Sequence, residues 1–267
     1  MECHEFFLWC VPVIRSSIFF YHRLKENNAL YSSLHLSNMA GKAILILENP
    51  WWTPYINKKR ASVLPFFQGM ENFLENFSVY HSFFYESNGF RAALKDDLTN
   101  TREDRLYIYI ASHGSGRTIA GCGSAPAIKL TTIFSEIEKI TQTTNIEGVV
   151  FGSCEVGNNI QDFKDVLIGT RIAWIFGYTC EIDWLPSTLI DLSIFEHLTK
   201  MSNSDLNKRE KIIMAFVHSL KKFDGDFIIG NRENICLKDA ITLVVKPRGR
   251  GNVPKDETVN LKQELNW

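Results

Sequence analysis

Leu106-Tyr-Ile-Tyr-Ile-Ala-Ser-His113-Gly114 is the stretch that decides the fold, and Gly148-Val-Val-Phe-Gly-Ser-Cys154-Glu155 has the same organisation. In both, the apolar residues run continuously, which is typical of a central strand that is covered on both faces. Each run stops at a residue that can do chemistry. In an open parallel sheet, sites form beyond the carboxyl ends of the strands. If the two strands are parallel neighbours, His113 and Cys154 therefore emerge side by side on one edge.

The rest of the chain alternates between strand and helix patterns from residue 42 to residue 220, which predicts an α/β fold with a doubly wound, mostly parallel sheet. Strands are expected at 42–48, 79–85, 106–111, 148–153 and 171–177, with late strands at 227–229 and 241–245. Helices are expected at 60–77, 89–98, 131–141 and 158–168, from Pro186 onward, and after Asp205. Residues 117–130 are expected to form a hairpin or loop.

The length of 267 residues is enough for one sizeable core. We expect a main domain over residues 39–245, an N-terminal appendage of uncertain status over 1–38, and a mobile polar tail over 246–267. The apolar run Phe6–Ile14 lacks a basic leader and is too short to span a bilayer. The appendage could instead be a segment that binds a partner or touches a membrane.

Charge and cysteine usage exclude several classes of function. Lys+Arg (29) and Asp+Glu (30) nearly cancel, so no basic surplus indicates direct nucleic-acid binding. The six cysteines form no CxxC pair, which argues against a cysteine-based metal site. The chain is also too large to need a disulfide framework. We therefore expect a cytoplasmic protein with reduced thiols and with neither a metal nor a cofactor.

A thiol beside an imidazole is the arrangement of a nucleophile and its base. Taken singly, each residue is ordinary, because a buried cysteine usually behaves as a small hydrophobic residue. Together, at equivalent strand ends and each near glycine, His113 and Cys154 favour a catalytic site. A free thiol titrates near pH ~8.5, so Cys154 would be assisted by the imidazole and by a helix N-terminus near Asn158.

The two motifs, Ser-His113-Gly114 and Gly-Ser-Cys154-Glu155-Val-Gly157, resemble those of the caspase-like (clan CD) cysteine peptidases, nearest to the bacterial CHAT-domain and separase-like proteases. The resemblance covers residues 42–200. It implies a three-layer caspase-like sandwich and a cysteine endopeptidase. It also implies that Cys154 is the nucleophile, that His113 carries the proton, and that the backbone amides of Gly114 and Cys154 form the oxyanion hole.

The resemblance also bears on specificity. Metacaspases carry an acid two positions before the cysteine, where this chain has Gly152. The segment Tyr178-Thr-Cys-Glu181-Ile-Asp183-Trp184 is similar to the acidic, tryptophan-containing segment that helps to form the S1 pocket in separase and CHAT proteins. This implies that Asp183, and secondarily Glu181, selects Arg or Lys. The same acids could simply begin the next helix, where a carboxylate favours the helix dipole.

The expected partners are a protein or peptide substrate, cleaved after a basic residue, and a regulatory protein. The second follows from the resemblance, because such bacterial proteins commonly act as regulated effectors, sometimes in defence against phage. Two alternatives remain open. One is a catalytically silent caspase-like interaction module. The other is a thiol hydrolase or acyltransferase that acts on small esters or amides.

Overall fold

The computed structural model describes residues 41–50, 61–99, 101, 103–119, 126–230, 232 and 234–267. The chain divides into two units, Met1–Ala40 and Gly41–Trp267, and the structure describes only the second. The expected appendage, 1–38, therefore lies outside the described residues. Within the described ranges, no helix is both long enough and apolar enough to cross a bilayer.

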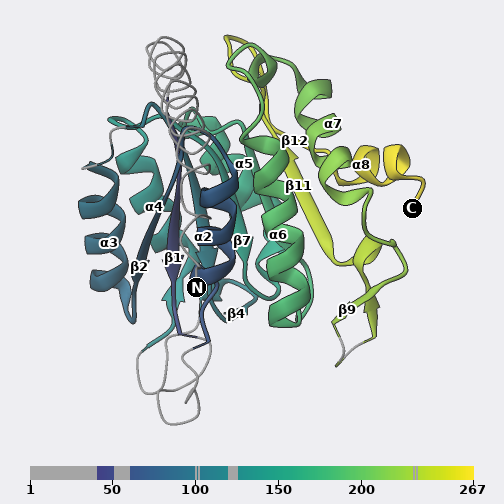
Figure 1. The fold of residues 1–267 in the computed structure, drawn as a ribbon, viewed down its shortest axis with the longest axis horizontal. Helices are drawn as coiled ribbons and strands as arrows, with labels where there is room; N and C mark the ends of the chain where they lie inside the picture. Colours follow the sequence, from purple (N-terminus) through teal and green to yellow (C-terminus); the bar gives the residue numbers. More distant parts are fainter. Residues whose placement is uncertain are drawn as a thin grey trace, which may run out of the picture. The chain divides into compact units, whose positions relative to one another are not determined.

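A seven-stranded sheet forms the centre of the second unit (Figure 1). In sequence order its strands are β1 (Lys42–Glu48), β2 (Phe77–Phe83), β3 (Arg105–Ala111), β7 (Ile146–Gly152), β8 (Trp174–Tyr178), β11 (Ile241–Val245) and β12 (Lys255–Asp256). Their order across the sheet is β12-β11-β8-β7-β3-β1-β2. The five strands from β8 to β2 are parallel, whereas β11 is antiparallel to β8 and β12 is antiparallel to β11. The mostly parallel sheet expected from the sequence is confirmed.

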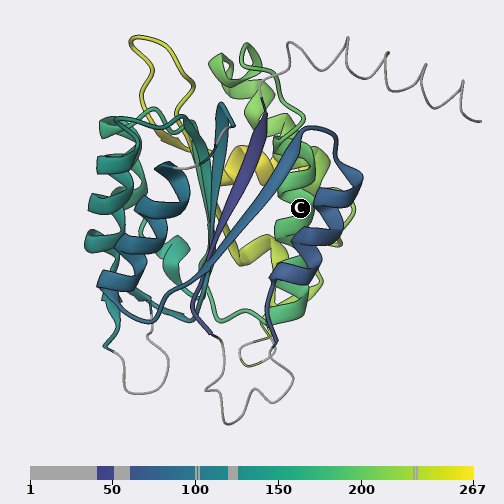
Figure 2. The ribbon, with the colours of Figure 1, turned by 60° about the vertical axis from the view of Figure 1, so that its left-hand side comes forward.

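Helices cover both faces of this sheet, as Figure 2 shows. One face carries α3 (Ser87–Thr99), α4 (Leu130–Ile140) and α5 (Ile160–Gly169). The other carries α2 (Leu64–Phe73), α6 (Trp184–Leu198) and α7 (Arg209–Leu220), with α8 (Thr258–Leu265) against α7. The expected three-layer α/β sandwich is thus present.

Alternation along the central strands divides the core in two. In β3, Tyr107 and Tyr109 point to the α2/α6/α7 side, whereas Ile108 and Ile110 point to the α3/α4/α5 side. This is the two-residue period of a pleated strand, applied to residues that are all apolar. Both faces are buried, which explains the continuous apolar runs.

Short strands and 3-10 turns lie outside the seven-stranded sheet. Two minor sheets join β4 (Gly114–Ser115), β5 (Thr118–Ile119) and β6 (Ile128–Lys129), and β9 (Ile228–Gly230) with β10 (Ile235–Cys236). The 3-10 turns are η1 (Val156–Asn158), η2 (Asp205–Asn207) and η3 (Leu237–Asp239).

Several expected element boundaries differ from the structure. The strand expected at 79–85 spans Phe77–Phe83, and the strand expected at 171–177 spans Trp174–Tyr178. The helix expected at 60–77 spans Leu64–Phe73 and ends where the backbone of Leu74 becomes extended; Asn76 then adopts a left-handed conformation (φ 53°), and Phe77 begins β2. The segment expected to be a mobile tail contains β12 and α8. Leu261 of α8 is fully buried, so apolar packing holds this segment in place despite its polar average composition.

Candidate active site

His113 and Cys154 follow two strands that are direct neighbours in the sheet. In the parallel β3–β7 register, Ala111 is paired with Gly152, so His113 and Cys154 each lie two residues beyond the last pair. The chains stay together past the strand ends, because the hydroxyl oxygens of the buried Ser112 and Ser153 are 3.0 Å apart and hydrogen-bonded. The structure therefore brings the two residues to one edge of the sheet at equivalent positions, near β4 at the bottom of Figure 1.

Gly114 lies directly against the backbone of Cys154. A Cβ atom on Gly114 would be 3.0 Å from the nitrogen of Cys154 and closer still to its carbonyl oxygen. No side chain can be accommodated at those distances, so only glycine permits this approach. The N–H of Gly114 donates a hydrogen bond to the thiol sulfur of Cys154.

The loop after His113 is fastened to the segment after Cys154. Glu155, which has a left-handed backbone (φ 61°), accepts a hydrogen bond on Oε2 from the N–H of Gly116 at 2.8 Å. The side-chain amide of Asn159 donates to the carbonyl of Gly116 at 2.9 Å, and Arg117 forms an ion pair with Asp162 at 2.7 Å. These contacts fix the position of the loop after His113 relative to the segment after Cys154.

The sulfur of Cys154 lies largely within the core on the α2/α6/α7 side, with the residue 8% exposed. Burial raises the pKa of this thiol above its ordinary value, because the charged form loses its hydration. The N–H of Ile182, 3.4 Å from the sulfur, opposes the rise, whereas the carboxylate of Glu181 adds to it. The resting group at neutral pH is thus the thiol, and a base is needed to make it a nucleophile. His113, an exposed residue, lies on the same edge.

The two acids expected to select a basic side chain flank Ile182, the residue whose N–H reaches the sulfur. Glu181 is partly exposed, and its carboxylate forms an ion pair with Arg232 at 2.8 Å. Asp183 is half-buried at the N-cap of α6, and its N–H donates to the carbonyl of Ile229 at 2.9 Å. Asp183 therefore does begin the next helix, and it directly follows Ile182 in the chain.

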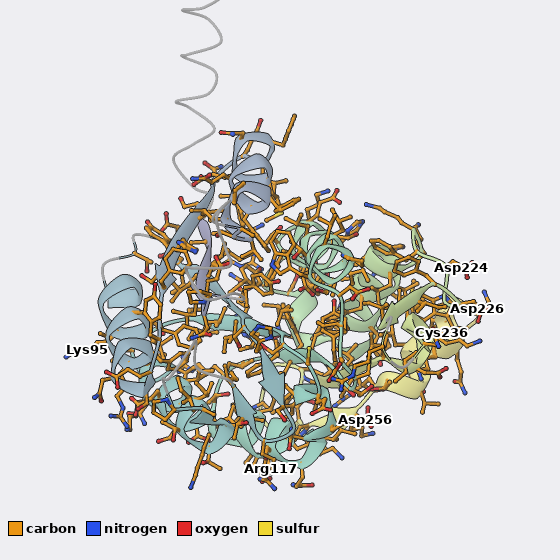
Figure 3. All side chains as sticks on the ribbon, turned by 90° about the horizontal axis from the view of Figure 1, so that it is seen from below. Lys95, Arg117, Asp224, Asp226, Cys236 and Asp256 are labelled. Carbon is orange, nitrogen blue, oxygen red and sulfur yellow. The ribbon has the colours of Figure 1, made fainter. Side chains whose placement is uncertain are left out.

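The other cysteines of the described ranges have different surroundings. Cys180 is buried, whereas Cys236 is partly exposed on β10. Figure 3, seen from below, places Cys236 near Asp224 and Asp226 and on a different side of the molecule from Arg117, which belongs to the loop after His113. The described residues contain no group of three or more His, Cys, Asp or Glu side chains that could hold a metal ion.

Sequence reasoning did not identify two of the groups around the sulfur. The contribution of Ile182 is a backbone N–H, which any residue except proline supplies, so it leaves no signal in the sequence. Glu155 belongs to the cysteine motif, but its partner Gly116 is 39 residues away. Its role could be read only from the fold.

Comparisons with known proteins give matches at the level of structure. No family model matches the chain, and no curated protein matches its sequence. One similar structure is "iotapain", a secreted C11 cysteine protease from Bacteroides thetaiotaomicron, with 12% identity, a TM-score of 0.47, and coverage of 78% of this chain and 67% of that chain. Another is a secreted C11 cysteine protease from the same organism in complex with an irreversible peptide inhibitor. It has 9% identity, a TM-score of 0.46, and coverage of 77% of this chain and 66% of that chain. The chain thus spans about two thirds of the length of these proteins.

Proposed function

We propose that this protein is a cysteine endopeptidase in which Cys154 is the nucleophile and His113 carries the proton. The observation that supports this best is the matched register of β3 and β7, with Gly114 against the backbone of Cys154. A structural cysteine needs no histidine at the equivalent position, nor a glycine that leaves its backbone open.

The raised pKa of Cys154 determines how the reaction would start. His113 accepts the thiol proton as the sulfur attacks the carbonyl carbon of the substrate, giving a tetrahedral oxyanion. The N–H groups of Gly114 and Cys154 stabilise that oxyanion. The Gly114 N–H already donates to the sulfur in the resting site, so it lies within reach of an oxygen on the carbon that the sulfur attacks.

The later steps return the site to its resting state. The tetrahedral intermediate collapses, the C–N bond breaks, and the leaving amine takes the proton from His113. The acyl group remains on Cys154 as a thioester. His113 then accepts a proton from a water molecule that attacks this thioester, and the thiolate leaves and takes that proton back.

Asp183 and Glu181 are proposed to bind a basic side chain of a protein or peptide substrate. Their place on either side of Ile182, whose N–H reaches the sulfur of Cys154, supports this. A substrate cation would replace Arg232 in its exposed ion pair with Glu181. We further propose a regulated effector in a reducing, cytoplasmic compartment that is switched by a protein partner. The size of the chain and its large apolar core, which need no disulfide framework, support the reducing environment.

The test is cleavage of fluorogenic peptides that vary at the residue before the scissile bond. We expect cleavage after Arg or Lys, with a loss of roughly 10³-fold or more in Cys154→Ala and in His113→Ala. Cys236→Ser, a thiol outside the site, is the matched control and should retain full activity. Mass spectrometry after treatment with an arginyl electrophile should find the label on Cys154.

Other results would point to the alternatives. Label on Cys180 or Cys236, or cleavage that survives in Cys154→Ala, would reject the assignment of the nucleophile. Hydrolysis of small thioesters without any peptide cleavage would favour a thiol hydrolase or acyltransferase. Wild-type protein that is inert toward both substrates and toward the electrophile would favour an interaction module.

A further inference from the structure

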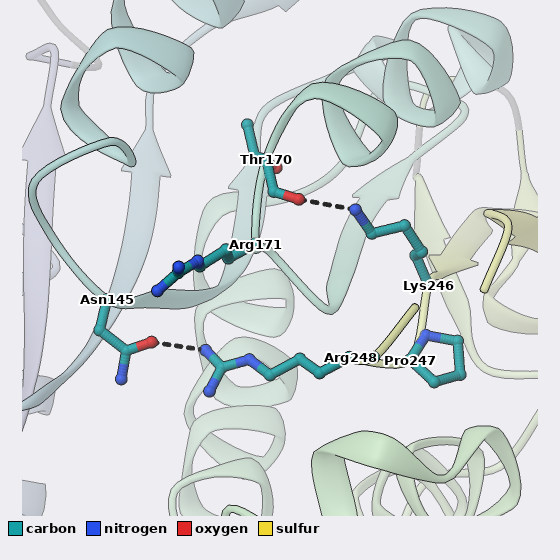
Figure 4. Close-up of a pocket in the computed structure, with 7 residues that line it drawn as sticks. Asn145, Thr170, Arg171, Lys246, Pro247 and Arg248 are labelled. Atoms are coloured by element: carbon teal, nitrogen blue, oxygen red, sulfur yellow. Dashed lines mark hydrogen bonds between the residues drawn. The ribbon is translucent and has the colours of Figure 1, made fainter. Parts of the chain in front are cut away.

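A pocket lies at the opposite edge of the sheet from Cys154, where the parallel strands begin. It has a volume of about 360 Å³. Its walls come from Asn145 just before β7, Thr170 and Arg171 just before β8, and Lys246 and Arg248 just after β11 (Figure 4). Strand β7 runs between the two edges, so this pocket is separate from the candidate active site.

Of the residues that the structure describes, three cations and no acid line this pocket. Figure 4 shows the guanidinium groups of Arg171 and Arg248 both pointing toward Asn145, whereas Lys246 turns toward Thr170. Lys246 donates to the backbone carbonyls of Leu167 and Thr170, which carry no charge to balance it. The pocket therefore combines a concentrated positive charge with space for a ligand.

The nearest buried carboxylate is already occupied. Glu147 accepts two hydrogen bonds from Arg105, at 2.5 and 2.7 Å, and one from the hydroxyl of Tyr107 at 2.5 Å. Arg248 lies farther from this carboxylate, at 3.8 Å. The single carboxylate of Glu147 thus faces the guanidinium groups of both Arg105 and Arg248. The charge around this pocket therefore remains positive. An adjoining hollow that shares Asn145 is lined by Glu103 and Asp104, so the cationic surface ends there.

Arg248 also carries an unused donor. Its Nη2 donates to the side-chain oxygen of Asn145 at 2.7 Å, but its buried Nε has no hydrogen-bond partner among the described residues. A buried donor without a partner is costly, and an incoming acceptor would relieve that cost. The backbone around Arg248 is fixed, because its N–H donates to Leu206 and its carbonyl accepts from the side chain of Asn252.

We propose that this pocket binds a small molecule through a phosphate group, held by Arg171, Lys246 and Arg248. A phosphate provides two negative charges and several acceptor oxygens, which suits two guanidinium forks and an ammonium. A single carboxylate would leave more of the positive charge unbalanced. The volume exceeds that of one phosphate, so the natural ligand carries further atoms.

The test is calorimetric titration of the full chain with pyrophosphate and with inorganic phosphate, at ionic strength kept constant with sodium chloride. We expect saturable binding at one site per chain, with pyrophosphate tighter than malonate, a dicarboxylate control. Arg171→Ala should weaken pyrophosphate binding by roughly tenfold or more, because a hydrogen bond to a charged group is worth ~1.5–3 kcal/mol. Arg250→Ala, an exposed arginine two residues beyond Arg248 and outside the pocket lining, is the matched control and should leave binding unchanged.

Arg171 is exposed, so its removal should leave the unliganded melting temperature unchanged, which separates lost binding from lost folding. Arg248→Lys keeps the positive charge but removes the guanidinium group that can donate two parallel hydrogen bonds, and should also weaken binding. The proposal is overturned if neither phosphate compound binds saturably, if malonate binds as tightly as pyrophosphate, or if Arg250→Ala weakens binding as much as Arg171→Ala. None of these readouts depends on peptidase activity.

Discussion

Gly114 is the residue at which space is most limited near the thiol. In Gly114→Ala, the new methyl group would collide with the carbonyl oxygen of Cys154, so the loop after β3 must move away and take its N–H with it. We expect peptidase activity to fall by roughly 10²-fold or more, as when one oxyanion donor is lost. Gly69→Ala is the matched control, because nothing lies within 4 Å of its Cβ position in α2. Activity equal to wild type in Gly114→Ala would contradict this role.

Asp191 of α6 gives a prediction about pH. Burial raises the pKa of this carboxyl to about 7, although the hydroxyls of Tyr178 and Tyr109 donate to it at 2.8 and 2.9 Å and lower the value. An unfolded aspartate titrates near pH ~3.9, so the folded protein holds this proton more tightly than the unfolded chain. The resulting stabilisation is complete below about pH 4 and is lost as the pH rises through 7.

Urea denaturation of wild type and Asp191→Asn between pH 4 and pH 8 checks this. The wild type should lose up to roughly 4 kcal/mol more than the variant over this range, because the amide that replaces the carboxyl cannot ionise. Comparing the two proteins cancels the titration of every other group that the substitution leaves undisturbed. Parallel stability curves would show that Asp191 is ionised throughout or that its pKa is unshifted.

Among the elements, α8 makes the largest difference between expectation and structure. Leu261 is fully buried, whereas Val259 of the same helix is 65% exposed. We expect Leu261→Ala to lower the free energy of unfolding by ~2–4 kcal/mol, and Val259→Ala to change it by ~0.5 kcal/mol or less. Chemical denaturation measures both. Equal, small effects would mean that the C-terminal segment does not contribute to the core.

The sequence predicts β3 to within one residue and β7 to within two, because both strands are buried on both faces and are largely apolar. It does not predict that the charged residues Arg105 and Glu147 belong to these strands. That His113 and Cys154 lie at the same edge of the sheet could also be predicted, because both residues follow strands that are parallel neighbours. α8 could not be predicted, because its apolar residues are sparse and become buried only when the helix packs against α7 and β11. Nor could the contact of Ile182 with the sulfur, since it is made by the backbone.

At the scale of the whole molecule, Glu147 and Arg105 connect separate parts of the chain at the edge of the sheet far from Cys154. Arg105 on β3 binds Glu147 on β7 and also donates to the carbonyl of Met201 after α6 at 2.7 Å. Both side chains are almost entirely buried. Burial opposes the charge of Arg105, but the hydrogen bonds from its guanidinium to Glu147 raise its pKa above the ordinary value.

Glu147→Gln should therefore destabilise the protein by ~3–5 kcal/mol, because it leaves a buried guanidinium without its countercharge. Glu196→Gln removes a carboxylate that binds Lys200 and Lys222 at the surface, and should cost ~1 kcal/mol or less. Thermal and urea denaturation of the two variants make the comparison. A Glu147→Gln protein as stable as Glu196→Gln would show that the buried pair is dispensable.

The shared register of β3 and β7 makes the candidate site sensitive to the length of either strand. Side-chain direction reverses at every residue of a strand, so duplicating one residue inside β7 would advance Cys154 by about 3.3 Å and turn its thiol to the opposite face of the sheet. An insertion of one residue in a surface loop shifts nothing comparable. Whether the number of residues in each strand is odd or even therefore decides which face of the sheet the thiol points to. This limits how the chain can vary, whatever substrate it acts on.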